Sequence, residues 1–498
     1  MFRVTQCLAS VMAFSFLATG LQAQDLRLPV DTVITTQHQV MIRGEAVPYA
    51  AHLGFLPVFD ADGAVIASLN YTFYERTDIE DRENRPLMVS FNGGPGSASL
   101  WMHLGYTGPR QLRIDDEGYP TMPYGFRDNP NSILDVADIV FVNPVNVGYS
   151  RMVGEPQPRR FFGVNEDISY LSDWIRTFVT RHERWANPKF LIGESYGTTR
   201  VSGLARELQG SEWMYLNGVI LVSPTGLGLD RGGPMGDAMA LPNYTATAWY
   251  HGALEPSLQN RDLEDVLADV EDFTLDEYLP ALARAGSLSD AERRQMAEQV
   301  GRWAGVDPQW VLDYNLRPNV GEFRKELLRD QGMTVGRLDA RYKGLDAENS
   351  GEGYDYDPAL SAWNHAFSPA INIYMRQEFG FETDMQYYLF GPTPGWNRDG
   401  DSSGEDLARA MSENPYLHVF VQSGYYDGGT DYFGAKYNMW NMDPRGALQD
   451  RMRWKGYRSG HMMYLRAEDL VTSNQDIRDF VAWSLEATQG PAGYGIGN

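Results

Sequence analysis

The sequence predicts an α/β fold in which a mainly parallel sheet carries helices on both faces. Short, mainly apolar or strand-like runs recur along the chain and alternate with stretches of helical pattern such as 166–185. Strands of a parallel sheet read as continuous apolar runs because helices cover both faces. The expected strands are 87–91, 139–142, 190–192, 218–222, 417–421 and 453–457, and further helices are expected at 198–208 and 473–485.

The first segment, residues 1–23, is expected to be a secretory signal that precedes this fold. Arg3 is its only charged residue, residues 8–17 are apolar, and Leu21-Gln22-Ala23 supplies a small-residue cleavage site. The apolar run is too short to span a bilayer well. We therefore expect an exported protein, periplasmic or secreted, with no membrane anchor.

The composition limits the partners and the chemistry. A formal net charge of -24 argues against nucleic acid and anionic membrane surfaces as partners. Cys7 is the only cysteine and would leave with the signal, so the mature chain would lack disulfides and a thiolate nucleophile. The histidines show no metal-ligand spacing, so we expect no metal and no cofactor. A simple signal and a disulfide-free chain are typical of a bacterial protein, and the oligomeric state stays open.

Two features depart from the alternation of strands and helices. Residues 47–59 and 65–74 alternate around the turn at 60–63 and predict an antiparallel hairpin. Residues 262–328 are charged and helical and contain no strand-like run. Because the chain is too long for one simple domain, this stretch is interpreted as part of an insertion. The expected division is a catalytic domain of 24–225 and 368–498, with a helical insertion, 226–367, over the end of the sheet.

Helix starts within the insertion are predicted from two short patterns. Thr274-x-x-Glu277 and Ser289-x-x-Glu292 both match the capping box. In this motif the first side chain accepts a hydrogen bond from the first turn, and the glutamate bonds back to the first residue. A helix is therefore expected to begin after each.

A candidate nucleophile lies between one of the apolar runs and a helix. Gly193-Glu194-Ser195-Tyr196-Gly197 follows the expected strand at 190–192 and precedes the expected helix at 198–208. Strand, sharp turn and helix are the context of a nucleophile elbow, which exposes the serine hydroxyl above the sheet edge. The positive N-terminal end of the helix would face an oxyanion there. We predict Ser195 as the nucleophile.

Partners for Ser195 follow later in the chain, after the insertion. Asp427 lies in a glycine-rich turn directly after the expected strand at 417–421. His461 is the only histidine beyond it and follows the expected strand at 453–457. Serine, acid and histidine in this chain order fit a triad in which the histidine takes the serine proton. The other interpretations are a turn aspartate and a capping or packing histidine.

The oxyanion of such a reaction needs two backbone N–H donors. One would come from Tyr196, directly after the nucleophile. The other would come from Gly94 in the loop Asn92-Gly93-Gly94-Pro95-Gly96, which follows the expected strand at 87–91. The alternative for this loop is a plain tight turn.

These motifs together resemble the serine carboxypeptidase family. The residues that carry the resemblance are Asn92-Gly93-Gly94-Pro95-Gly96-Ser97-x-Ser99, Asn143 to Ser150, Gly193 to Gly197, Gly424-x-x-Asp427 and Gly460-His461-Met462. The resemblance implies an α/β-hydrolase with a helical cap that removes C-terminal residues from peptides, often best at acidic pH. It implies Ser195, Asp427 and His461 as the triad, Gly94 and Tyr196 as oxyanion donors, and Asn92 and Glu194 as ligands of the substrate's terminal carboxylate.

The chain departs from the family pattern at the carboxylate site. Tyr106 stands where the family usually has a second glutamate, and Ser90 where it usually has tryptophan. We expect the Tyr106 phenol to donate directly to the substrate carboxylate. Glu194 could donate only when protonated, so activity should favour acidic pH.

Three functions are compatible with these residues. The first is an exported serine carboxypeptidase acting on peptides. The second is a related esterase, acyl hydrolase or acyltransferase with the same triad and a remodelled cap. The third is a catalytically silent binding protein, against which the intact Ser195, Asp427, His461 and Gly94 argue.

Overall fold

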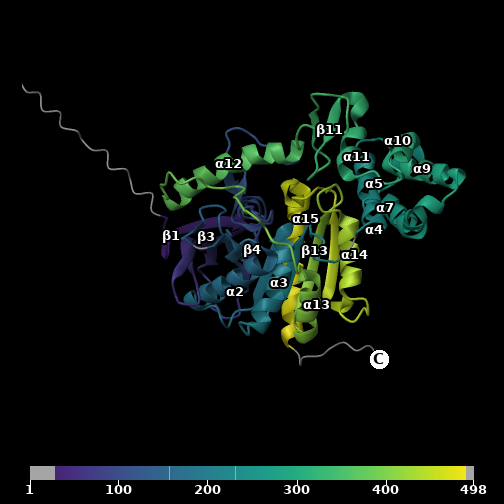
Figure 1. The fold of residues 1–498 in the computed structure, drawn as a ribbon. Coiled ribbons are helices and arrows are strands. Elements are labelled where there is room, and N and C mark those ends of the chain that lie inside the picture. The colour runs from purple at the N-terminus through teal and green to yellow at the C-terminus, as the bar shows by residue number, and fades with distance from the viewer. Residues whose placement is uncertain (1–27, 156, 230–231, 490–498) are drawn as a thin grey trace, which may run out of the picture.

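The computed structural model describes residues 28–155, 157–229 and 232–489, and the expected signal at 1–23 lies outside this part. Its main body is a mixed sheet with helices on both faces (Figure 1). The path across the sheet is β1-β2-β3-β7-β4-β9-β10-β13-β14, with β8 paired to β3. The strands are β1 Thr32–Ile42, β2 Glu45–Phe59, β3 Val65–Arg76, β4 Leu87–Phe91, β7 Asp138–Val142, β8 Arg151–Met152, β9 Lys189–Glu194, β10 Gly218–Val222, β13 His418–Gly424 and β14 Met452–Tyr457.

The α/β fold and its expected strands are confirmed. From β7 to β14 neighbouring strands pair in parallel, and β2 and β3 form the expected antiparallel hairpin. The sequence did not predict β1, which pairs antiparallel with β2 at the sheet edge. Most of β1 is exposed or half-buried, so it lacks the apolar run that marks the central strands.

Two apolar layers cover the two faces of the sheet. In β10, Ile220 and Val222 join one layer and Val219 and Leu221 join the other, because successive strand residues point to opposite faces. The first layer packs against α1 (Leu100–Met102), α12 (Pro358–Phe379) and α15 (Ala467–Glu486). The second packs against α2 (Val164–Arg181), α3 (Tyr196–Gly210), α13 (Ser403–Glu413) and α14 (Tyr432–Met442). A short ribbon, β5 (Arg110–Leu112) with β6 (Phe126–Asp128), lies outside the sheet.

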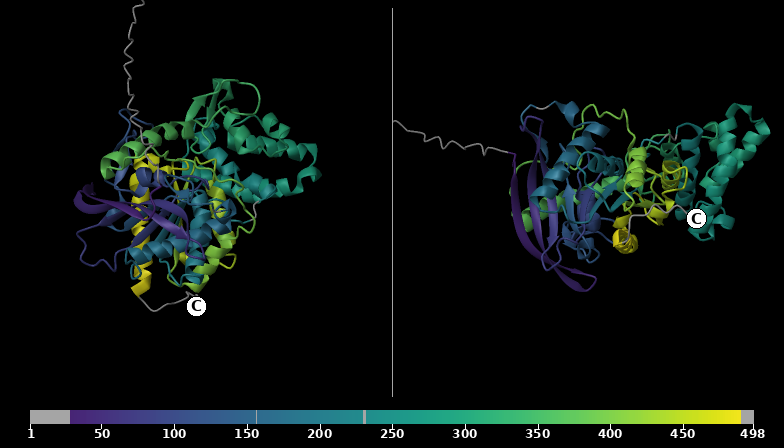
Figure 2. Two further views of the ribbon diagram at one scale, coloured as in Figure 1. Left: turned by 60° about the vertical axis from the view of Figure 1, so that its left-hand side comes forward. Right: turned by 90° about the horizontal axis from the view of Figure 1, so that it is seen from below.

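Between β10 and α12 the chain forms a group of helices at one end of the body (Figures 1 and 2). They surround a third apolar cluster, which also includes Tyr425, Tyr426, Tyr432 and Phe433. The elements are α4 Pro234–Met239, α5 Leu241–Tyr250, α6 Pro256–Gln259, α7 Leu263–Phe273, α8 Leu279–Arg284, α9 Asp290–Ala304, α10 Pro308–Asp313, α11 Val320–Glu326, and the antiparallel strands β11 Met333–Val335 and β12 Lys343–Leu345. Residue 367, the expected end of the insertion, lies inside α12.

The two capping predictions had different outcomes. Ser289 and Glu292 form the expected reciprocal capping box at the start of α9. The prediction at Thr274 was wrong, because α7 continues into a π-helical turn there and the Thr274 hydroxyl donates to the carbonyl of Val270 at 2.7 Å. No helix in the described ranges is long and apolar enough to cross a membrane.

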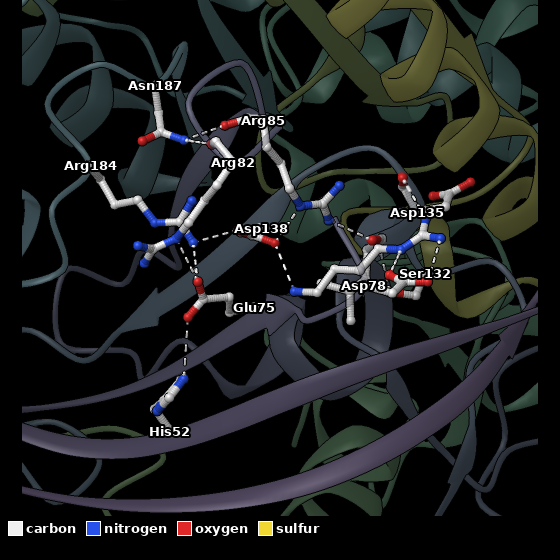
Figure 3. A network of polar contacts seen from close by, with 12 residues as sticks. His52, Glu75, Asp78, Arg82, Arg85, Ser132, Asp135, Asp138, Arg184 and Asn187 are labelled. Atoms are coloured by element: carbon white, nitrogen blue, oxygen red, sulfur yellow. Dashed lines mark hydrogen bonds and ion pairs between the residues drawn. The ribbon is translucent and has the colours of Figure 1, made fainter. Parts of the chain in front are cut away.

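A buried ion-pair network fixes the amino-terminal edge of the parallel strands (Figure 3). Asp138, the first residue of β7, accepts from Arg85 Nε at 2.6 Å and from Arg184 Nη2 at 2.6 Å. Arg184 also donates to Glu75 at 2.9 Å, and the Arg76 N–H donates to Asp138 at 3.0 Å. Because parallel strands share one direction, this edge is opposite to the one where β9 ends.

We expect Asp138→Ala to lower the free energy of unfolding by about 3–5 kcal/mol, because buried Arg85 loses its carboxylate partner and buried Arg184 keeps only Glu75. The exposed Arg409, paired along α13 with Glu413, is the control. Arg409→Ala should change stability by less than about 1 kcal/mol. Urea unfolding of both variants measures the difference, and equal effects would contradict a structural role for the network.

Candidate active site

Ser195 is the single residue between the end of β9 and the start of α3. Its backbone has φ 57° and ψ -128°, a left-handed conformation that non-glycine residues seldom adopt. Its N–H donates to the Val222 carbonyl at 3.0 Å, and its carbonyl accepts from the Thr198 N–H at 2.9 Å. Neighbouring backbone thus holds Ser195 in the strand–turn–helix context that the sequence predicted.

The glycines around Ser195 are required by close packing of three backbone segments. A Cβ on Gly193 would lie 2.2 Å from the Gly197 carbonyl oxygen, and one on Gly197 would lie 2.7 Å from that of Phe91. A Cβ on Gly93 would lie 2.4 Å from the Tyr196 nitrogen. The loop after β4 therefore lies directly against the turn that carries Ser195.

This packing places the loop that carries Gly94 beside the start of α3, where Tyr196 lies. Gly94, with φ 102°, lines one pocket together with Ser195. Tyr196 is the first residue of α3, so its N–H has no acceptor one turn earlier in the helix. Its side chain is buried away from the pocket, which leaves the backbone amide as its contribution.

Asp427 and His461 form a buried hydrogen-bonded pair. The His461 Nδ1–H donates to Asp427 Oδ2 at 2.6 Å. Asp427 also accepts from the N–H groups of Gly429 at 2.7 Å and Thr430 at 3.1 Å. Burial alone would lower the pKa of His461, but the charge and hydrogen bond of Asp427 outweigh it and raise that pKa above its usual value. With Nδ1 donating, Nε2 is the basic nitrogen, and His461 lines the same pocket as Ser195.

A segment of the insertion, 337–341, which we name the strap, holds both loops of this pair. The Leu338 carbonyl accepts from the His461 N–H at 2.6 Å. The Arg337 carbonyl accepts from the Gly428 N–H at 2.9 Å, and the Ala340 N–H donates to the Tyr426 carbonyl at 3.0 Å. The loop that carries Asp427 (the acid loop) and the loop that carries His461 (the histidine loop) are thereby bridged by residues from a distant part of the chain.

Asp339 of the strap is a buried carboxylate behind the histidine loop. Its Oδ2 accepts from the Gly460 N–H at 3.2 Å and from Arg341 Nη2 at 2.7 Å. Arg341 also donates to Ser459 Oγ at 3.0 Å. These residues could not be predicted from the sequence, because a charged Asp-x-Arg pair in a loop carries no local signal of burial.

Glu194 is a buried carboxyl at the base of the pocket. It accepts from Asn92 Nδ2 at 3.0 Å and from the Tyr464 hydroxyl. Burial raises the pKa of Glu194 to about 7, against the opposing effects of His461 and of the two hydrogen bonds. The expected neighbours Asn92 and Glu194 are therefore together, and the protonated form of Glu194 persists to near-neutral pH.

Tyr106 does not reach the pocket, so its expected role as a direct donor to a substrate carboxylate is wrong. Its hydroxyl donates to Gln422 Oε1 at 2.9 Å, and its ring stacks on Tyr464 with centroids 4.5 Å apart. Tyr464 lies beside Glu194 instead. Its only sequence signal is its position three residues after His461.

The pocket has a volume of about 400 Å³, enough for side chains on both sides of a peptide bond. Its polar lining includes Ser195, His461, Glu194 and Gly94, together with Ser97, Thr393 and Thr430. Its apolar and cationic lining comes from Trp101, Leu338, Leu360, Phe390, Met462 and Arg337.

Comparison with known proteins gives this arrangement a family context. Residues 43–253 match the family model described as serine carboxypeptidase. Over 166 residues the chain is 26% identical to "Serine carboxypeptidase-like 31" of Arabidopsis thaliana, covering 32% of this chain and 30% of that relative. Over 142 residues it is 31% identical to "Carboxypeptidase Y homolog A" of Leptosphaeria maculans, covering 28% and 23%. The chain thus spans less than a third of these relatives' length, and the matches support the serine carboxypeptidase family.

The fold has a counterpart among solved structures. The crystal structure of Kex1(delta)p, a prohormone-processing carboxypeptidase from Saccharomyces cerevisiae, aligns with a TM-score of 0.50 at 14% identity. The alignment covers 88% of this chain and 91% of that chain. The likeness shows a shared α/β-hydrolase fold.

Ionisation of Glu194 should destabilise the fold. Its pKa is about 7 in the structure, above its ordinary value of 4.5, so the protonated form is favoured on folding. The contribution of Glu194 to stability should be complete below about pH 4.5 and be lost, by on the order of 3 kcal/mol, as pH rises to about 7. Glu194→Gln should remove this decline, and urea unfolding of both proteins between about pH 4 and 8 measures it. If the stability of the wild type and of Glu194→Gln changed with pH in the same way, the raised pKa of Glu194 would be contradicted.

Proposed function

We propose that the protein is a serine carboxypeptidase that hydrolyses the C-terminal bond of peptides through an acyl-enzyme on Ser195. The observation that carries this proposal is the Asp427–His461 hydrogen bond at 2.6 Å, in one pocket with the strained Ser195. The family match over 43–253 supports the same reaction class. Export after removal of residues 1–23 and a cap role for 226–367 belong to the same proposal.

In the first step the Ser195 hydroxyl attacks the peptide carbonyl carbon while His461 Nε2 takes its proton. Asp427 keeps the proton on Nδ1 and stabilises the imidazolium. His461 then gives the proton to the leaving amine, which is the free C-terminal residue. Water, deprotonated by His461, attacks the acyl-enzyme and releases the shortened peptide.

Charge that develops on the carbonyl oxygen is stabilised by the backbone N–H groups of Gly94 and Tyr196. They are fixed by the contact between the loop after β4 and the turn, so they need no rearrangement during the reaction. The N-terminal end of α3 adds its dipole in the same direction.

The terminal carboxylate of the substrate would bind at Glu194, and Asn92, which does not line the pocket, would hold the Glu194 carboxyl through its Nδ2 donor. A protonated Glu194 donates a hydrogen bond to this carboxylate, whereas an ionised Glu194 repels it. Tyr464 donates to Glu194, whereas Tyr106, which we had expected to donate to the substrate carboxylate, donates to Gln422. Exopeptidase preference therefore depends on the protonated state of one buried carboxyl.

Ser195→Ala and His461→Ala should each lower kcat/KM for peptides by about 10⁴-fold or more, because members of a triad act as a unit. Mass spectrometry of a digested peptide mixture measures the turnover and the products. Ser412, whose hydroxyl donates along its own helix to the Ala408 carbonyl, gives the control Ser412→Ala with unchanged turnover. Near-wild-type turnover by Ser195→Ala would refute the assignment.

The pH profile should depend on the substrate's C-terminus. For free-acid peptides kcat/KM should fall as pH rises through about 7, because Glu194 loses its proton. Peptides with an amidated C-terminus should be poor substrates without this fall, and Glu194→Gln should flatten it. Tyr464→Phe should move the fall to higher pH, since the phenol stabilises the ionised form. The buried Tyr106→Phe is its matched control.

Equal cleavage of free-acid and amidated peptides at every pH would contradict the carboxylate site. A general acyl hydrolase would then describe the protein better. The same result would leave the roles of Ser195, Asp427 and His461 intact, because they act on the scissile carbonyl alone.

A further inference from the structure

Arg337, the first residue of the strap, brings a positive charge to the rim of the pocket. It is the only lysine or arginine among the described residues that line this pocket. Its Nη1 lies 3.5 Å from the position that a Cβ on Gly429 would occupy, so the guanidinium lies against the acid loop. The charge is thus placed beside Thr430 and His461, which line the same space.

The backbone of Arg337 is fixed on both sides. Its N–H donates to Asp357 Oδ1 at 3.1 Å, and its carbonyl accepts from the Gly428 N–H at 2.9 Å. The carbonyl of the next residue, Leu338, accepts from the His461 N–H. The rim position of the side chain is therefore set by the loops that hold the Asp427–His461 pair.

The guanidinium itself has no protein partner among the described residues, although the chain is strongly acidic. Asp357, which binds the Arg337 backbone, is occupied by the N–H groups of Arg337, Leu338 and Ala359. Four residues further on, Arg341 is paired with both Asp339 and Glu117. The donors of Arg337 thus remain available to a molecule in the pocket.

We propose that Arg337 is a specificity-determining residue that binds a carboxylate of the peptide substrate. A guanidinium fork matches a carboxylate with two parallel N–H···O bonds. The carboxylate would come from an acidic side chain next to the scissile bond or from the substrate's own C-terminus. Substrates with lysine or arginine beside the scissile bond are disfavoured by the same charge. This inference rests on the proposed peptidase function and names its substrate class as peptides that present a carboxylate close to the scissile bond.

The test is binding of four matched peptides by isothermal titration calorimetry. They carry Glu or Gln next to the scissile bond, each with a free or an amidated C-terminus. The proteins are Ser195→Ala, which cannot turn the peptides over, and the same protein with Arg337→Gln. The exposed Arg409→Gln, in the same Ser195→Ala background, controls for the loss of one positive charge.

Arg337→Gln should weaken binding about tenfold for each peptide that carries the carboxylate bound by Arg337. This loss of affinity should be smaller in about 1 M NaCl. Loss confined to both Glu peptides supports the acidic side chain as the source. A loss of affinity confined to the two peptides with a free C-terminus supports the terminal carboxylate as the group that Arg337 binds. If each of the four peptides binds equally well with and without the Arg337→Gln substitution, or if none binds to either protein, the assignment is overturned.

Turnover separates this inference from the proposed function. If the wild type binds the peptides in an Arg337-dependent way but never shortens them, the peptidase proposal fails and the carboxylate site stands. If it shortens Glu and Gln peptides equally, with and without Arg337, and the free-acid preference is unchanged, the peptidase proposal stands and the role of Arg337 fails.

Discussion

The close approach of three backbone segments around Ser195 is the constraint on which the site depends. The end of β9, the start of α3 and the loop after β4 meet at distances that exclude a Cβ at Gly93, Gly193 and Gly197. Ser195 has a positive φ where these segments meet, and we propose that the N–H groups of Gly94 and Tyr196 stabilise an oxyanion beside it. The buried Asp138 network joins the segments at the opposite end of the sheet, where Arg85 precedes β4 and Arg184 precedes β9.

The candidate triad depends equally on a distant part of the chain. The strap, 337–341, accepts from the backbone of His461 and of Gly428, and its buried Asp339 supports Gly460. The region we propose as a cap therefore positions the acid–histidine pair as well as covering the pocket. A substitution in the strap is expected to alter both specificity and rate, because Arg337 faces the pocket from the same short segment that holds His461.

The sequence predicted the features that are encoded locally. Apolar runs marked the central strands, and glycines beside Ser195 marked the turn before α3. The chain order of Asp427 and His461 predicted their pairing, because strand ends of a parallel sheet meet at one edge. Tyr464, Asp339 and Arg337 could not be found in this way, since contacts between segments far apart in the chain give them their roles. Tyr106 was misplaced because its motif position does not reveal that its phenol turns toward Gln422.

The most direct test of the account is mass-spectrometric mapping of the residue modified by an active-site fluorophosphonate. We expect one adduct per chain, on Ser195, formed by the folded protein and absent after unfolding in urea. The adduct should form more slowly as His461 becomes protonated, because Nε2 must accept the serine proton. An adduct on another serine, or none in the folded protein, would contradict the central claim that this turn carries the nucleophile.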